Sequence, residues 1–254
     1  MGFIVLFGGN SFEHEISIVS AITINKKIKN VEHFIFLDSN SRFYLVPSGS
    51  MKSKHFVNLS YKKDKELYLT NGGFIQKSLF GSKKISGIVI NIIHGKSGED
   101  GEIASLLGFY GINFIGPRME ASVLSFNKAL TKYFAKNRNI NVLPYEVFNK
   151  GDKININTPA IIKPARLGSS IGISIIKDKK ELDYSLDTAF EFDDTIVVEP
   201  FISNVKEYNL AGFYANGEMI FSMIEEVTKD EFLDFDKKYL DFNATNKPKI
   251  ANLS

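Results

Sequence analysis

The chain has 254 residues, 44% of them hydrophobic and 24% charged, so it can form one large domain or two to three small ones with an ordinary core. Lys and Arg number 31 against 29 Asp and Glu, a balance too even for a nucleic-acid-binding stripe or a membrane-binding surface. The lack of cysteine excludes disulfides, thiolate metal sites and a cysteine nucleophile. We find no signal-peptide pattern and no stretch near the ~18 apolar residues of a membrane helix, and we expect a cytoplasmic protein.

Strand and helix patterns alternate over the first 117 residues. Short apolar runs at residues 3–7 and 33–38 predict strands, and the continuous apolar run at 87–93 is typical of a strand covered on both faces. Apolar residues at helical spacing follow the first and third runs. The alternation predicts a parallel sheet with crossover helices, although residues 50–84 show no readable pattern.

The pattern changes after residue 117. An apolar stripe over residues 123–133 predicts one amphipathic helix, and two strands are expected at 160–164 and 171–176, separated only by a loop. A further strand is expected at 195–201. The dipeptide Asn216-Gly217 between apolar runs predicts a tight hairpin turn. This half of the chain should therefore be antiparallel or mixed.

The loop KPARLGSSIG, residues 163–172, has the composition of a phosphate-binding loop but not the usual order. Its lysine precedes the glycines, unlike a P-loop, and it leads into a strand rather than a helix, unlike a dinucleotide fingerprint. Backbone N–H groups of its turn could bind an anion beside Lys163, with the hydroxyls of Ser169 and Ser170. From these residues alone, a flap over a polyphosphate and a plain glycine-rich hairpin with a surface lysine both remain open.

Six stretches, in this order, resemble the D-alanine–D-alanine ligase family of the ATP-grasp superfamily. They are GGNSFEHEISIVSA (8–21), HGKSGEDGEIASLL (94–107), ASVLSFNKALTK (121–132), IIKPARLGSSIG (161–172), VVEPFISNVKEYNLAG (197–212) and EFLDFDKKYLDF (231–242). The resemblance implies an ATP-grasp fold, of class α/β and α+β, preceded by a parallel-sheet N-terminal domain. It implies an N-terminal domain at 1–117, a central ATP-grasp subdomain with the glycine-rich flap at 118–203, and an incomplete C-terminal subdomain with an ω-loop at 204–254.

The resemblance also implies a reaction. The family transfers the γ-phosphate of ATP to the carboxylate of one D-alanine, and the amine of a second D-alanine attacks the acyl phosphate to form the dipeptide used in peptidoglycan precursors. ATP, Mg²⁺ or Mn²⁺ and two D-alanine molecules are the expected ligands, and a homodimer is expected. No nucleic acid or membrane partner is expected.

Residue by residue, the nucleotide site implied by the resemblance is spread over the second half of the chain. Lys128, Lys163 and Lys238 match phosphate-binding lysines, and charge-assisted contacts of this kind are strong. Ser169 and Ser170 lie in the flap above the phosphates. The remaining matches contact the nucleoside: Glu199 accepts from the adenine amino group, Phe201 and Ile202 line the adenine slot, and Glu207 accepts from the ribose hydroxyls. The residue patterns alone also allow a solvated helix lysine at position 128 and a solvated carboxylate at position 199.

The first D-alanine is expected to contact the N-terminal domain. By the resemblance, Glu13 holds its ammonium group and His94 lies near its carboxylate. Tyr239 matches a tyrosine that closes over the site and bonds the hydroxyl of Ser169, itself linked to Glu13. A simple capping role for Glu13, a structural role for His94, and helix-start charges at Glu99-Asp100 are the plainer alternatives.

The resemblance places the metal ligands, an arginine that stabilises the tetrahedral intermediate and the second D-alanine pocket in a region beyond Ser254. No metal ligand is therefore expected in this chain, which looks truncated, and a protein of these 254 residues alone is expected to be inactive. Two other functions remain open: a related ligase with D-lactate or D-serine as acceptor, which Tyr239 disfavours, and a non-catalytic nucleotide-binding module.

Overall fold

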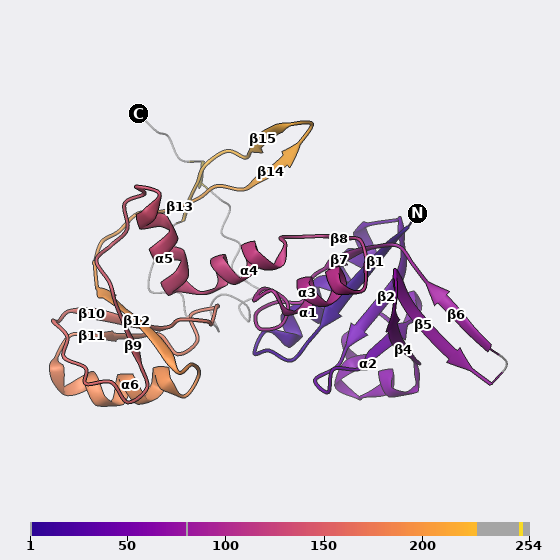
Figure 1. The fold of residues 1–254 in the computed structure, drawn as a ribbon, viewed down its shortest axis with the longest axis horizontal. Helices are drawn as coiled ribbons and strands as arrows, with labels where there is room; N and C mark the ends of the chain where they lie inside the picture. Colours follow the sequence, from indigo (N-terminus) through magenta and orange to yellow (C-terminus); the bar gives the residue numbers. More distant parts are fainter. Residues whose placement is uncertain (1, 80, 228–248, 251–254) are drawn as a thin grey trace. The chain divides into compact units, whose positions relative to one another are not determined.

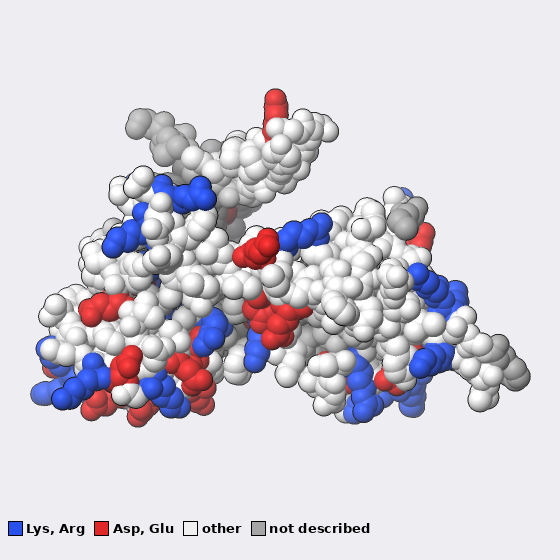
Figure 2. Space-filling model, in the orientation of Figure 1, with Lys and Arg blue, Asp and Glu red and all other residues white. Residues whose placement is uncertain are grey.

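The computed structural model describes residues 2–79, 81–227 and 249–250 (Figure 1). The chain forms two compact units: Met1–Val142 with Ala165–Gly168, and Leu143–Pro164 with Ser169–Ser254. Within the described residues, no helix has the length and apolarity needed to cross a membrane. Figure 2 shows acidic and basic side chains interspersed around α6 (Leu182–Phe190) in the second unit, in line with the nearly even charge count.

An eight-stranded sheet organises the first unit. Its strand order is β6-β5-β4-β3-β2-β1-β7-β8. The strands are β1 (Phe3–Gly8), β2 (Val31–Leu37), β3 (Phe43–Val46), β4 (Lys65–Thr70), β5 (Gly73–Ser78), β6 (Gly81–Ile85), β7 (Ile88–Asn91) and β8 (Phe114–Ile115). Strands β2, β1, β7 and β8 are parallel, as expected, but β3 to β6 form an antiparallel meander. The prediction of a parallel sheet was therefore right for only half of its strands.

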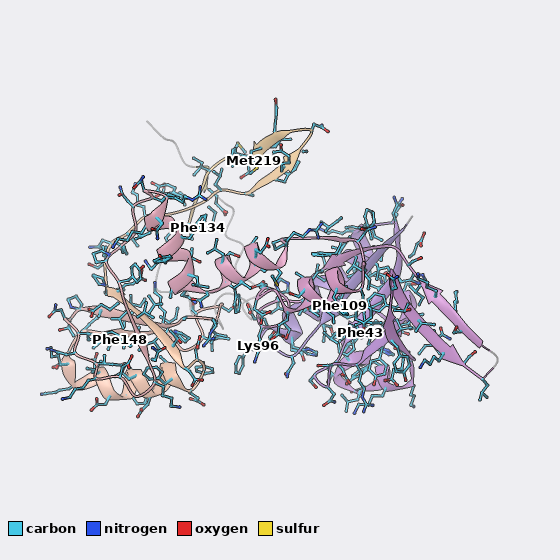
Figure 3. All side chains as sticks on the ribbon, viewed as in Figure 1. Phe43, Lys96, Phe109, Phe134, Phe148 and Met219 are labelled. Carbon is cyan, nitrogen blue, oxygen red and sulfur yellow. The ribbon has the colours of Figure 1, made fainter. Side chains whose placement is uncertain are left out.

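Strand β1 is buried on both faces of this sheet. Ile4 and Leu6 pack into one apolar cluster, which α3 (Glu102–Phe109) helps to cover. Val5 and Phe7 pack into the other cluster, against α1 (His14–Lys27). Because successive side chains of a strand point to opposite faces, the run FIVLF has to be apolar throughout. Phe43 lies in the first of these clusters (Figure 3).

The remaining helices of the first unit are short. They are α2 (Ser53–Val57), α4 (Met119–Phe126) and α5 (Lys128–Asn137), with 3₁₀ turns η1 (Ser48–Ser50) and η2 (Ser60–Lys63). The expectation of one helix over residues 123–133 was wrong. Asn127 has extended backbone angles, φ −87° and ψ 109°, and its side chain accepts hydrogen bonds from the N–H groups of Ala129 and Leu130. It therefore ends α4 and caps α5.

A four-stranded sheet forms the core of the second unit. Its strand order is β11-β10-β12-β9, and all its pairs are antiparallel. These strands are β9 (Glu146–Asn149), β10 (Ala160–Pro164), β11 (Ser174–Ile176) and β12 (Thr195–Pro200). Helix α6 follows the 3₁₀ turn η3 (Lys179–Glu181) and packs on one face, where Phe148 joins the apolar cluster (Figure 3). The two strands predicted on either side of the glycine-rich loop are confirmed as the pair β10 and β11.

Shorter strands follow in the second unit. They are β13 (Glu207–Asn209), β14 (Gly212–Ala215), β15 (Glu218–Phe221), β16 (Glu225–Val227) and β17 (Lys249–Ile250). Strands β14 and β15 form the predicted hairpin. Both turn residues have positive φ, 52° at Asn216 and 86° at Gly217, which a type I′ turn requires.

Replacing Asn127 by Ala should loosen the start of α5. The variant loses both capping hydrogen bonds, a change that costs about 1 kcal/mol and should speed amide exchange at Ala129 and Leu130 about fivefold. Hydrogen exchange followed by NMR would measure the effect, and Asn127→Asp, which keeps the acceptor, is the control. Unchanged exchange at these two amides in the Ala variant would contradict the capping role.

Candidate functional site

The turn between β1 and α1 passes very close to the end of β2. Gly8 and Gly9 have φ values of 97° and 89°. A Cβ on Gly8 would lie 2.3 Å from the carbonyl oxygen of Leu37, so only glycine fits there. The imidazole Nδ1 of His14 donates to the carbonyl oxygen of Gly9 at 2.6 Å and holds the turn from the helix side.

Glu13 is the last residue of this turn, and its side chain is buried, with 6% exposure. It occupies the N-cap position of α1, but its carboxylate accepts no capping hydrogen bond from the helix. Glu13 therefore lies at the helix N-terminus, as the plainer interpretation expects, but does not cap α1 by a side-chain hydrogen bond. A buried carboxylate at the edge of a parallel sheet is a candidate for ligand binding.

Two glycines lie next to this carboxylate, and the first of them leaves the space that it occupies. A Cβ on Gly95 would lie 2.3 Å from Oε2 of Glu13, and Gly95 also has a φ of 68°. A Cβ on Gly168 would lie 3.7 Å from both carboxylate oxygens. The structure thus brings together the turn after β1, the loop after β7 and the start of the glycine-rich loop, three segments that are remote in sequence.

His94 lies in the loop after β7, immediately before Gly95. Its Nε2 is 3.4 Å from the hydroxyl of Ser20, and its Nδ1 is 3.6 Å from Oε1 of Glu99. Glu99 therefore faces the imidazole instead of serving only as a helix-start charge. Asp100 does have the helix-start role, since its carboxylate accepts from the N–H groups of Ser97 and Glu102.

Lys128, the first residue of α5, is partly buried and points at the glycine-rich loop. Its backbone N–H donates to the carbonyl oxygen of Ala165 at 2.9 Å, and its ammonium group donates to the carbonyl oxygen of Leu167. The alternative of a fully solvated helix lysine is therefore wrong. The ammonium group lies against the same loop segment that approaches Glu13.

Lys163 and Glu199 form an ion pair in the second unit, with Nζ 2.5 Å from Oε2. Ile161 is paired with Glu199 in the antiparallel register of β10 and β12, and Lys163 with Val197. Lys163 and Glu199 are therefore diagonal neighbours on one face of the sheet. Glu199 is only 4% exposed, so the carboxylate is not solvated, contrary to the plainer interpretation.

Other predicted nucleotide-site residues lie nearby in the second unit. Glu199 and Phe201 line a cavity of about 430 Å³ together with Tyr145, Asn157 and Thr158. Ile202 is half exposed, and Glu207 begins β13 with an exposed side chain.

The tip of the glycine-rich loop has an unusual backbone. Ser169 and Ser170 both have positive φ, 53° and 61°, a conformation that non-glycine residues rarely adopt and that recurs at ligand-binding turns. Lys238 and Tyr239, the predicted ω-loop residues, lie outside the described residues. Among the residues that the structure does describe, no three His, Asp or Glu side chains gather in a way that could hold a metal ion.

Sequence reasoning missed three residues around Glu13. Gly95 gives the carboxylate its space, Gly168 lies beside it, and Ser11 hydrogen bonds in the same turn. All three lie inside the motifs used above, in the sequences GGNSFE, HG and LGSS, but residue types alone do not reveal which backbone atoms come together. Asn127, which sets the start of α5 and thus the place of Lys128, was missed for the same reason.

Removing the ammonium group of Lys163 should destabilise the second unit. In Lys163→Met, the carboxylate of Glu199 loses a charged partner, and we expect a loss of about 2 kcal/mol in the free energy of unfolding, moderated because the Lys163 side chain is 25% exposed. The double variant Lys163→Met/Glu199→Gln should recover part of this loss. Urea unfolding followed by circular dichroism would measure both, and strictly additive losses would contradict the coupling.

Two family models and several named relatives match this chain over most of its length. A family model described as the D-ala D-ala ligase N-terminus matches residues 2–117, and one described as the D-ala D-ala ligase C-terminus matches residues 134–253. D-alanine--D-alanine ligase of Wolinella succinogenes is 56% identical over 257 residues, which cover 100% of this chain and 74% of that protein. The Campylobacter lari enzyme of the same name is 54% identical, over 98% of this chain and 73% of its own.

Solved structures show the same relationship. The crystal structure of D-alanine-D-alanine ligase from Helicobacter pylori matches with a TM-score of 0.84 and 50% identity, covering 91% of this chain and 76% of that one. VanG D-Ala:D-Ser ligase from Enterococcus faecalis matches with a TM-score of 0.76 and 25% identity, covering 94% of this chain and 73% of its own. On the strength of the two family models and these relatives, the chain belongs to the D-alanine–D-alanine ligase family.

Proposed function

We propose that this protein joins two D-alanines at the expense of ATP, forming the D-alanyl-D-alanine used for peptidoglycan synthesis. The family membership supports the reaction class, and relatives of at least 50% identity carry the name of this enzyme. The structural observation that carries the proposal is the buried carboxylate of Glu13, held beside two glycine backbones and not used to cap its helix.

Glu13 is the proposed acceptor for the ammonium group of the first D-alanine. A buried carboxylate binds an amino group strongly, because both charges are then shielded from water. His94, next to Gly95 in the loop that contacts Glu13, is the proposed partner for the carboxylate of the same amino acid. The small side chain of alanine suits a site whose surrounding segments approach this closely.

The nucleotide is proposed to bind through lysines and the second sheet. Lys128 and Lys163 contact the phosphates, Ser169 and Ser170 supply flap hydroxyls, and the backbone of their turn supplies N–H groups. Glu199 accepts from the adenine amino group, while Phe201 and Ile202 flank the ring; Glu207 accepts from the ribose. Lys238 and Tyr239, outside the described residues, stay proposed as the phosphate lysine and the closing tyrosine of the lid.

The chemistry then follows from these positions. An oxygen of the first D-alanine's carboxylate attacks the γ-phosphorus, the bond to ADP breaks, and an acyl phosphate forms. The neutral amine of the second D-alanine attacks the acyl carbon, phosphate leaves, and the amine proton is released. Closure of the glycine-rich loop over the acyl phosphate would keep water from hydrolysing it.

Family membership also implies a divalent metal, proposed as Mg²⁺ or Mn²⁺, which screens the charge of the transferring phosphoryl group. The described residues do not fit this ion, since they contain no suitable group of ligands, and no step above depends on one. The homodimer and the cytoplasmic location expected from the sequence stay predictions; sedimentation analysis would test the first.

Glu13→Gln should weaken binding of the first D-alanine with little effect on ATP. Loss of a charge-assisted hydrogen bond should raise KM for D-alanine about 10- to 100-fold and leave KM for ATP within about twofold. Glu15→Gln, the same change on the exposed side of α1, is the matched control. The assay measures ADP release by the intact protein as a function of D-alanine.

Product identity decides between the remaining functions. Mass spectrometry should show D-alanyl-D-alanine. A product containing D-lactate or D-serine would favour the related ligases, one of which shares this fold. ADP release that does not depend on D-alanine would contradict the proposed reaction. So would a lack of ADP release, with Mg²⁺ present, from a protein of the same full length as the relatives.

A further inference from the structure

The hydroxyl of Ser11 connects the two loops that carry Glu13 and His94. It donates a hydrogen bond to the carbonyl oxygen of His94 at 2.7 Å and accepts one from the backbone N–H of Glu13 at 3.1 Å. The two bonded backbone groups belong to residues on different loops, one after β1 and one after β7. A single side chain therefore links these two backbone groups directly.

Gly95 lies in close contact with both Ser11 and Glu13. A Cβ on Gly95 would lie 3.3 Å from both Cβ and Oγ of Ser11, and 2.3 Å from Oε2 of Glu13. The loop after β7 thus passes directly over Ser11 and Glu13, with no room for a side chain between them. If the hydroxyl were removed, this loop would lose the bond that holds it against the carboxylate.

Ser17 makes a similar connection deeper in the fold. Its hydroxyl accepts from the N–H of Gly8 at 2.9 Å and donates to the carbonyl oxygen of Ile92 at 2.7 Å, and the residue is fully buried. It joins the same two strands, β1 and β7, at their carboxyl ends. The hydroxyl of Ser17, unlike that of Ser11, has both of its hydrogen bonds to residues other than Glu13 and His94. Only the backbone N–H of Ser17 reaches Glu13, donating to its carbonyl oxygen at 3.1 Å, and Ser17→Ala keeps that bond.

We propose that Ser11 is a positioning residue for the first amino acid substrate. Its hydroxyl bonds the backbone of Glu13 and of His94, and by fixing these two backbone segments it sets the spacing of the two side chains for the ammonium and carboxylate groups of one small α-amino acid. The inference rests on the proposed function and adds to it a residue that touches no substrate. A misplacement of about 1 Å in such a pair is enough to lower catalytic efficiency strongly.

Ser11→Ala should raise KM for D-alanine about 5- to 30-fold, as expected for loss of the paired hydrogen bonds, with KM for ATP within about twofold. Ser11→Thr, which keeps the hydroxyl, should restore most of the affinity. Ser17→Ala is the matched control: it should lower the melting temperature at least as much as Ser11→Ala, because its hydroxyl is fully buried, while changing KM for D-alanine less than about twofold.

Calorimetry of D-alanine binding to the intact protein, in the presence of a non-hydrolysable ATP analogue, distinguishes a failure of this inference from a failure of the proposed function. Binding to the wild type and weaker binding to Ser11→Ala would support the inference. Equal binding to both, no rescue by Thr, or an equal KM increase in Ser17→Ala would overturn it, since each result would mean that Ser11 has only a structural role. No binding of D-alanine to the wild type would instead overturn the proposed function.

Discussion

The burial of β1 on both faces of its sheet is the constraint on which the first unit depends. Because its side chains are apolar on both sides, β1 must lie inside the sheet, between β2 and β7, and parallel to both. Parallel strands end at the same edge, so the turn after β1 and the loop after β7 are forced to meet there. Glu13 and His94 come from these two segments. Their proximity is thus a consequence of core packing, and the serine hydroxyls at positions 11 and 17 refine a meeting that the core already imposes.

The burial of the Glu13 carboxylate at this edge of the sheet requires an energetic explanation. A charged group can be buried at acceptable cost only where polar or charged groups surround it, so the position of Glu13 depends on the segments that meet at this edge. The approach of Gly95 and Gly168 to the Glu13 oxygens brings peptide backbone where side chains would otherwise be. At Gly95 a side chain would clash with the carboxylate, so glycine is required there, and the burial of the carboxylate from bulk water strengthens its attraction for an ammonium group.

Much of the fold follows from local sequence patterns, and the exceptions have physical causes. The central strands are continuous apolar runs, and the hairpin at Asn216-Gly217 needs positive φ at both turn residues, so both were predictable. Strands β3 to β5 contribute buried residues such as Phe43, Leu67 and Phe74 to the core, whereas β6, at the edge of the sheet, is mostly exposed and polar. Edge strands of this kind carry little apolar periodicity to detect. The helix split at Asn127 was missed because an apolar stripe continues across it, while one side chain decides the cap.

The candidate site was predictable in its residue types but not in its contacts. Ordered motifs pointed to Glu13, His94, Lys128 and Lys163, yet bridges such as that of Ser11 join backbone groups whose approach depends on the whole sheet. The same holds for Lys163 and Glu199, 36 residues apart, whose pairing depends on the register between β10 and β12.

The pairing of Lys163 and Glu199 also explains how a nucleotide site can be built from partly buried charges. Each residue is the other's partner before any nucleotide binds, so neither charge has to be desolvated alone when the protein folds. In the proposed complex, a phosphate oxygen takes over the ammonium group and the adenine amino group takes over the carboxylate. Binding then replaces the ion pair by two contacts to the nucleotide. The net binding free energy therefore depends on whether ATP provides a partner for Lys163 and for Glu199 at the same time. A ligand with phosphates but no amino group on its base would leave the buried carboxylate without a donor to replace Lys163, which favours adenine over bases without an exocyclic amino group, such as uracil and hypoxanthine.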